Sequence, residues 1–228
     1  MIVGVLEGAR VGNETDRFNY RVMLYPDALE ATVARPSVPA KSRAHCPEPD
    51  LERSKQVAAR RASAATRRFV VANHLSDLVT LTFAGAPPSA KTLRRSMNDA
   101  VRSIRARVGS VPWLWVPHLG TTTGRLHSHA FFGRGAFDPA CWRFGRIHIT
   151  PLKTVDEMRR RAGYVSKQYL DPLDEFRQRY RCAQGFQPKP EIISVGSIDE
   201  GLAFLASRFG EPSHINLTQW GAHTQWNN

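Results

Sequence analysis

Hydrophobic and polar residues alternate in three stretches in the middle of the chain, and this alternation predicts three β-strands. The first stretch, residues 78–83, is apolar and β-branched and ends before Gly85. In the second, residues 111–118, two tryptophans fall on one face, with Leu and Val on the other; the third covers residues 125–132. Because only a short loop of Gly and Thr joins the last two stretches, we expect them to form an antiparallel hairpin.

Longer segments around these strands have the composition and the spacing of helices. Residues 51–68 contain neither Gly nor Pro and are rich in Ala and Arg. Residues 89–108 repeat apolar positions every three to four residues, which places them on one side of a helix. A third helix is expected over residues 153–170, before the break at Asp171-Pro172.

The ends of the chain have shorter patterns, and they set the expected domain boundaries. Residues 35–50 are rich in Pro, Ala and Ser, which indicates an extended linker. Further short elements are expected as strands at 1–6, 19–24, 142–149 and 191–195 and as a helix at 199–209. We therefore predict an N-terminal segment and linker (1–50), a main domain (51–190) and a C-terminal extension packed on that domain (191–228).

The net charge of the chain indicates what kind of partner it binds. The 228 residues carry a formal net charge of +12, and the sequence pI is about 10.3. Six of the 32 basic residues are lysine, so 26 are arginine, the side chain that binds phosphate with two hydrogen bonds and stacks on bases. This excess predicts a polyanionic partner, nucleic acid first, although a GC-rich genome also favours Arg and Ala.

Several other classes of protein are disfavoured by what the sequence lacks. Its three cysteines, Cys46, Cys141 and Cys182, are too few and too widely spaced for a disulfide framework, which favours a reducing cytoplasm. No apolar run reaches the length of a membrane span. There is no phosphate-binding loop of a nucleotide-driven motor, so strand unwinding would need another protein.

Two histidines stand one residue apart in the third strand, and they are the first candidate site. Side chains alternate along a strand, so His127 and His129 share one face, about 6.6 Å apart along it, and could hold one metal ion. A hairpin brings His118 near the His127 end, but the sequence does not fix the register that decides whether it faces the same side. The alternative is a pair of surface histidines, with His118 capping a turn.

A tyrosine and a lysine in the expected helix at 153–170 are the second candidate site. Tyr164 and Lys167 are three residues apart and therefore share a helix face. A tyrosine can attack phosphorus as a phenolate, while the ammonium stabilises the phenolate or neutralises the phosphate. Such a pair also arises by chance, but its combination with the histidine strand and a basic chain favours phosphoryl transfer.

The order of these motifs resembles that of HUH endonucleases. The strand Leu81-Thr82-Phe83 is followed by His127-Ser128-His129 and then by Tyr164-Val165-Ser166-Lys167. This order is similar to that of the rolling-circle replication initiator (Rep) proteins of plasmids and single-stranded DNA phages. The Arg-rich segment before residue 78 resembles that of actinobacterial members, and the resemblance covers roughly residues 52–190.

The resemblance implies a fold, a reaction and partners. The fold would be α+β, with a central antiparallel sheet of about five strands flanked by helices. His127 and His129 would bind Mg²⁺ or Mn²⁺, and Tyr164, assisted by Lys167, would cut one DNA strand to leave a 5′-phosphotyrosyl link and a free 3′-OH. The substrate would be a single-stranded DNA origin or hairpin in the cytoplasm of a bacterial host, with a separate helicase and polymerase.

The chain departs from the family pattern at three positions. Relatives have a third metal ligand on a neighbouring strand, and here we assign His118. Ser128 stands where an apolar residue is usual, but its side chain should face away from the metal. Some relatives have a second tyrosine four residues on; Tyr169 is five residues after Tyr164, about 140° around a helix, which predicts a single-tyrosine enzyme with Tyr169 packing or contacting DNA.

The basic residues of two segments form the predicted DNA-binding set. Charge runs are often only the solvated face of a helix, but in a chain of this charge we assign them to phosphate contacts. They lie in the predicted helix at 51–68 and just before the histidine strand: Arg60, Arg61, Arg67, Arg68 and Arg125.

Other functions compete with this interpretation. A plasmid relaxase or a single-tyrosine transposase would use the same chemistry, and a non-catalytic DNA-binding protein could share the fold. A phosphoesterase of the 2H class has two His-x-Ser/Thr elements, for which His74-Leu75-Ser76 and His148-Ile149-Thr150 are candidates. That class leaves His127, His129 and Tyr164 without a role.

Overall fold

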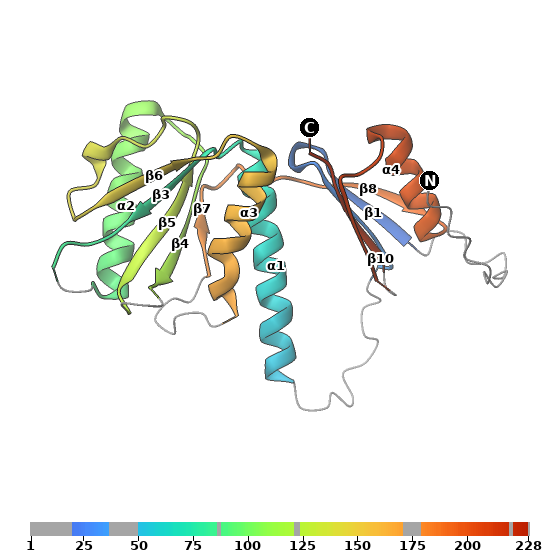
Figure 1. The fold of residues 1–228 in the computed structure, drawn as a ribbon, viewed down its shortest axis with the longest axis horizontal. Helices are drawn as coiled ribbons and strands as arrows, with labels where there is room; N and C mark the ends of the chain where they lie inside the picture. The colour runs from blue at the N-terminus through green and yellow to red at the C-terminus, as the bar shows by residue number, and fades with distance from the viewer. Residues whose placement is uncertain are drawn as a thin grey trace. The chain divides into compact units, whose positions relative to one another are not determined.

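The protein is an α+β structure with two five-stranded antiparallel sheets and four α-helices (Figure 1). The computed structural model describes residues 20–36, 50–85, 88–120, 124–170, 179–218 and 221–227. None of the helices in these ranges is long and apolar enough to cross a membrane. The chain divides into two compact units, each of which is described by itself.

The larger unit contains the sheet with the histidines, in the strand order β6-β3-β5-β4-β7. Every neighbouring pair in it is antiparallel. Its strands are β3 (Asp77–Leu81), β4 (Trp113–Leu119), β5 (Leu126–Phe132), β6 (Ile147–Pro151) and β7 (Arg181–Cys182). The three predicted central strands and the hairpin between the last two are thus confirmed.

The fourth predicted strand begins later than its sequence pattern indicates. Residues 142–149 were expected to be extended, but β6 starts at Ile147. Trp142 is buried in the preceding loop and packs edge-on against Phe83, with ring centroids 5.2 Å apart. The apolar residues before β6 therefore fill the core from a loop, which their pattern alone cannot distinguish from a strand.

Three helices cover the two faces of this sheet. They are α1 (Leu51–Ala72), α2 (Ala90–Val108) and α3 (Val155–Val165). Each has a side chain at its N-cap that accepts a hydrogen bond from the first turn: Asp50, Ser89 and Thr154. In Figure 1, α2 lies on one face of the sheet, and α1 and α3 lie on the other.

The α2 face of the sheet is apolar along its length. Val79, Leu81 and Ala130 pack there with the helix side chains Leu93 and Met97. These helix residues are spaced by four, as the sequence pattern required, and both are completely buried. This face is therefore part of the hydrophobic core. It holds in place the strands whose opposite face carries the candidate site.

The opposite face is apolar only where α1 and α3 cover it. Leu78 and Leu114 lie on either side of Phe131 in the strand register and pack with Val70 of α1 and Val165 of α3. The same strands continue beyond this cluster, with polar side chains pointing to the same side. The candidate site lies there.

The third helix is shorter than predicted, because its geometry changes at Ser166. The α-helix ends at Val165, and a 3₁₀ helix, η4 (Ser166–Tyr169), replaces the expected last turn. Two hydroxyl contacts from α1 hold it: Ser63 Oγ lies 2.7 Å from Ser166 Oγ, and Thr66 Oγ1 lies 2.9 Å from the Tyr169 hydroxyl. These long-range contacts were not visible in the helical pattern.

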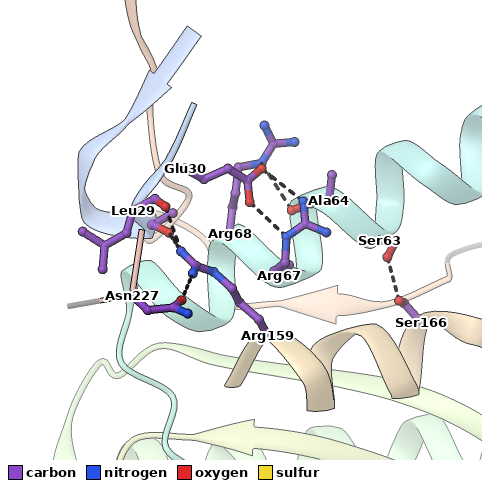
Figure 2. A network of polar contacts seen from close by, with 10 residues as sticks. Leu29, Glu30, Ser63, Ala64, Arg67, Arg68, Arg159, Ser166 and Asn227 are labelled. Atoms are coloured by element: carbon purple, nitrogen blue, oxygen red, sulfur yellow. Dashed lines mark hydrogen bonds and ion pairs between the residues drawn. The ribbon is translucent and has the colours of Figure 1, made fainter. Parts of the chain in front are cut away.

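A buried carboxylate, that of Glu30, which groups with the larger unit together with Tyr25, also holds the C-terminal half of α1 (Figure 2). Glu30 is only 1% exposed and accepts two hydrogen bonds from Arg67, at 2.9 and 3.2 Å. Arg68 lies 3.8 Å from the same carboxylate and stacks over the Tyr25 ring at 4.3 Å. Because a buried charge needs such partners, both arginines have a structural role.

The second unit contains the other sheet, in the strand order β8-β1-β2-β10-β9. Its elements are β1 (Tyr20–Tyr25), β2 (Glu30–Ala34), β8 (Glu191–Val195), α4 (Ile198–Phe209), β9 (His214–Thr218) and β10 (Gly221–Gln225). The predicted strands at 19–24 and 191–195 and the helix at 199–209 are confirmed. A side chain at Gly201 would meet Val33 at 2.7 Å, so this glycine lets α4 pack closely on the sheet.

The second sheet differs from the domain boundaries expected from sequence. Residues 20–24 and 31–36 group with residues 190–226 in one unit, instead of forming an N-terminal segment and a separate C-terminal extension. β2, β9 and β10 were not predicted from the sequence. Trp226 is buried there against Phe209, while the strand expected at 1–6 and Trp220 lie outside the described residues.

Candidate metal and tyrosine site

The strand register places three histidines on one face of the sheet. His118 of β4 lies directly opposite His127 of β5, and His129 lies opposite Thr80 of β3. Opposite residues of an antiparallel pair point to the same side. The register, which the sequence left open, thus brings the side chain of His118 to the face of His127 and His129.

The three imidazoles are close enough to share one ion. One nitrogen from each ring can be chosen so that all three lie within 4.8 Å of one another. The ring centroid of His118 is 4.7 Å from that of His127 and 4.9 Å from that of His129. The Nε2 atoms of His127 and His129 are 3.3 Å apart.

Hydrogen bonds from the surrounding strands orient two of these rings. Nδ1 of His127 donates to the carbonyl oxygen of Arg125 at 3.1 Å, which leaves Nε2 with its lone pair in the neutral ring. Nδ1 of His129 lies 3.1 Å from Thr80 Oγ1, and this hydroxyl oxygen can accept a hydrogen bond from the ring N–H. Nδ1 of His118 is buried without a hydrogen-bond partner among the described residues.

Burial keeps two of the rings neutral at physiological pH. Desolvation, with a smaller contribution from neighbouring His127, lowers the pKa of His118 to about 4. Desolvation, followed by the proximity of His127 and His118, lowers the pKa of His129 to about 3. Neutral imidazole is the form that binds metal, so the environment that makes protonation costly favours a cation at the centre of the cluster.

These residues fit a divalent transition metal. Two imidazole nitrogens bound to one tetrahedral ion at about 2.0–2.1 Å lie about 3.3 Å apart, as the Nε2 atoms of His127 and His129 do. An orienting hydrogen bond on the other ring nitrogen is typical of metal-binding histidines. Imidazole suits transition-metal ions better than Mg²⁺, which prefers oxygen.

Tyr164 lies over this cluster from the last turn of α3. Its ring stacks on that of His118 with centroids 6.3 Å apart and planes 22° apart, and it meets His129 edge-on at 6.0 Å. It is 46% exposed, in contrast to the neighbouring Val165, which is completely buried. The structure therefore brings the predicted nucleophile and all three predicted ligands together.

Gln168 connects the tyrosine segment to the histidine hairpin. Its amide nitrogen donates to the carbonyl oxygen of Leu119 at 2.9 Å, and its amide oxygen accepts from the Leu119 backbone N–H at 3.1 Å. These two bonds have the pattern of a backbone pair between neighbouring strands, and they are made at the residue after His118. It fixes the end of β4 to η4 and so holds His118 and Tyr164 in one arrangement.

The other tyrosine of the motif belongs to the core. Tyr169 is 2% exposed, and its hydroxyl is bonded to Thr66. Desolvation raises its pKa, which opposes phenolate formation. The structure gives Tyr169 the packing role of the two roles predicted for it, in the core cluster that contains Val165 of α3, with Thr66 of α1 as its hydrogen-bond partner.

Lys167 lies beyond the end of the observed α-helix. The α-helix ends at Val165, so Tyr164 is in α3 and Lys167 is in η4. Its side chain is exposed and makes no hydrogen bond or ion pair within the described part of the chain. It is available to a substrate phosphate.

The predicted DNA-binding arginines separate into two groups. Arg60 and Arg61 are exposed on α1, where they can reach a phosphate. Arg67 and Arg68 are instead occupied by Glu30, and Arg125 donates to the backbone carbonyl oxygens of Phe83 and Gly85. The last three thus have structural partners within the protein.

Sequence reasoning missed polar residues that extend the site across the sheet. His148 of β6 lies opposite Thr80, and Arg146 precedes it by two residues, so alternation places both on the histidine face. Both side chains are exposed. The alternation at 146–150 was the available signal, but without the pairing of β6 to β3 it could not be connected with His129.

Comparison with known proteins adds no relative. No protein-family model, curated protein or solved structure matches this chain.

Proposed function

We propose that this protein is a metal-dependent endonuclease and strand transferase acting on single-stranded DNA, with Tyr164 as nucleophile. In this proposal the larger unit has the HUH nuclease fold, and the reaction starts rolling-circle replication at an origin. The observation that carries the proposal is the position of the exposed Tyr164 ring over three histidines, two of them held neutral by burial.

The open half of the sheet supports a polyanionic substrate. Arg146, His148 and Lys167 are exposed around the cluster. In the described residues of this face, no carboxylate joins the three histidines as a fourth candidate ligand. A phosphodiester entering between Tyr164 and the histidines therefore meets cationic and neutral donors.

The proposed reaction is one phosphoryl transfer with balanced bonds. The Tyr164 oxygen forms a bond to phosphorus as the bond between phosphorus and O3′ breaks. The phenolic proton leaves to solvent, O3′ takes up a proton, and the 5′-phosphate stays on the tyrosine. The phosphodiester energy is kept in the new bond, so a 3′-OH can reverse the reaction and join strands without a nucleotide cofactor.

Each residue of the site has a defined task. His118, His127 and His129 would hold the cation, which when bound polarises the phosphate as a Lewis acid. Thr80 and the Arg125 carbonyl orient two of the rings, and Gln168 keeps the tyrosine segment beside them. A separate helicase and polymerase would unwind the duplex and extend the 3′-OH.

Covalent capture tests the proposal. The protein is incubated with Mn²⁺ and single-stranded oligonucleotides that carry candidate origin hairpins, and the mixture is denatured and analysed for a protein–DNA adduct. We expect an adduct that maps to Tyr164, disappears in Tyr164→Phe and fails in EDTA. An adduct that persists in Tyr164→Phe would show that the nucleophile is another residue.

Tyr169→Phe is the matched control. It removes a hydroxyl from the same segment, five residues away, but on a buried ring bonded to Thr66. We expect it to retain the adduct and to lose about 1 kcal/mol of stability with that hydrogen bond. Loss of the adduct in this variant, with the fold intact, would contradict the assignment of a single nucleophile.

A further inference from the structure

A groove of ≈ 1130 Å³ lies on the larger unit at the far end of the histidine strand. It is lined by residues from the C-terminal half of α2 and from β7, the edge strand beside β4. Trp113 at the start of β4 lines it, whereas His118 is five residues further along. At about 3.4 Å per residue, the groove is about 17 Å from the histidine cluster.

The lining of the groove is strongly cationic. Arg102, Arg105, Arg179 and Arg181 line it, and among the residues that the structure describes no acidic side chain does. Arg102 and Arg105 share a helix face, and Arg181 pairs with Trp115, which places it on the α2 side of the sheet. The ion pair of Arg102 with Asp99, at 3.3 Å, is largely exposed and weak.

Aromatic rings stand beside these arginines. Trp113 and Tyr180 both line the groove and are half-buried. Tyr180 stacks on the buried Tyr169, with centroids 6.0 Å apart and planes 29° apart, so its ring is fixed before any ligand arrives. Guanidinium groups beside fixed aromatic rings are the combination that binds single strands, with phosphates on the charges and bases on the rings.

We propose that this groove binds a segment of single-stranded nucleic acid, with phosphates at Arg102, Arg105 and Arg181 and a base stacked on Trp113 or Tyr180. This site is separate from the histidines and needs no chemistry at Tyr164. Charge favours a polyanion over a protein partner, and the rings favour unpaired bases over a duplex, whose bases are stacked inside.

The salt dependence of binding tests the groove. Binding of a fluorescently labelled oligothymidylate is measured by anisotropy over a range of salt concentrations, with Tyr164→Phe in every protein so that no adduct forms. We expect the double variant Arg102→Gln/Arg105→Gln to bind more weakly and to reduce the slope of log K against log salt by about 1.4, which corresponds to two lost phosphate contacts.

A control on the same helix separates the groove from general charge. Arg94→Gln/Arg95→Gln removes the same charge from exposed positions of α2 that do not line the groove, and we expect its slope to equal that of the parent. An unchanged slope in the groove variant, or an equal reduction in both variants, would overturn the proposal.

Cross-linking tests the stacking independently. An oligonucleotide containing 5-bromodeoxyuridine is irradiated with the protein, and the linked peptides are identified by mass spectrometry. We expect links in the peptides that contain Trp113 or Tyr180; links confined to other peptides would overturn the stacking. Absence of the Tyr164 adduct with these results intact would overturn the nuclease proposal alone.

Discussion

One face of the β6-β3-β5-β4-β7 sheet has two halves that differ in side chains but share the same strands. Under α1 and α3, Phe131 lies between Leu78 and Leu114, and all three are buried. Two residues before Phe131 on β5, the same face carries His129. Two residues earlier still it carries His127, which lies opposite His118. One half is core and the other half is the candidate site.

The difference shows how a rigid site is made from ordinary strand alternation. The backbone that positions the histidines is held by the apolar half and by the α2 face beneath it. Ser128 illustrates the separation: its side chain is completely buried on the α2 side, while its neighbours point to the site. Stability and chemistry are therefore assigned to different residues of the same strand and can be tested separately.

The largest expected effect comes from exchanging one residue in each half. Phe131→Ala should lower the free energy of unfolding by about 3–5 kcal/mol, because it leaves a cavity between α3 and the sheet. His129→Leu should leave metal-free stability equal or higher, since it removes a buried polar ring, but should abolish Mn²⁺ binding and the DNA adduct. Denaturant unfolding and calorimetric Mn²⁺ titration measure the two.

Two outcomes would break this division. If His129→Leu unfolds the metal-free protein as severely as Phe131→Ala does, the histidines belong to the core. If His129→Leu still binds Mn²⁺ with the parent affinity, the cluster is not the metal site. Phe131→Leu is the conservative control and should retain the adduct at a cost below that of Phe131→Ala.

The next effect concerns pH, because the site half contains titrating groups and the core half does not. Unfolding returns His118 and His129 to an ordinary pKa near 6.5, whereas burial lowers the pKa to about 4 and about 3. The unfolded chain thus binds more protons below pH 6.5. The stabilising contribution is complete above that pH and is lost as pH falls toward the folded values.

Metal-free unfolding at pH 7 and pH 4 should show this dependence. We expect the parent to lose roughly 2–3 kcal/mol more than His129→Leu over this interval, as follows from about 1.4 kcal/mol per unit of pKa difference. His148→Gln, at an exposed histidine of the same sheet, should lose as much as the parent. Equal losses in the parent and His129→Leu would mean that His129 is not buried in its neutral form.

The features of the two sheet halves that depend on alternation along the strands were predictable from the sequence. The strands, the hairpin and the shared face of His127 and His129 follow from a period of two. The side of the sheet to which His118 points depended on register, which local pattern does not encode. Gln168 could not be found, because its partner is the backbone of Leu119, 49 residues away.

Charge patterns were less informative than alternation. Arg60 and Arg67 are indistinguishable in a basic helix, yet Arg60 is exposed and Arg67 binds the buried Glu30. The deciding residue lies 37 positions away in sequence. Three strands of the second sheet, β2, β9 and β10, were missed for a similar reason, since such short strands gain stability from pairing and not from their own sequences.

The smallest effect should come from the contact that joins the two sides of the site. Gln168→Leu removes both hydrogen bonds to Leu119 and should reduce the rate of adduct formation about tenfold, equivalent to about 1.4 kcal/mol, because Tyr164 and His118 are no longer held together. Mn²⁺ affinity should change little, since His127 and His129 keep their own hydrogen bonds. Rapid-quench sampling of the adduct and calorimetric Mn²⁺ titration measure the two quantities.

Gln187 provides the matched control for Gln168, because it makes the same kind of contact elsewhere. Its amide donates to the Ala183 carbonyl oxygen and accepts from the Gly185 N–H, both at 3.0 Å. Gln187→Leu should cost similar stability but leave adduct formation at the parent rate. If both variants slow the reaction equally, Gln168 only stabilises the fold. If only Gln168→Leu does so, the hairpin and the tyrosine segment must be held together for the site to work.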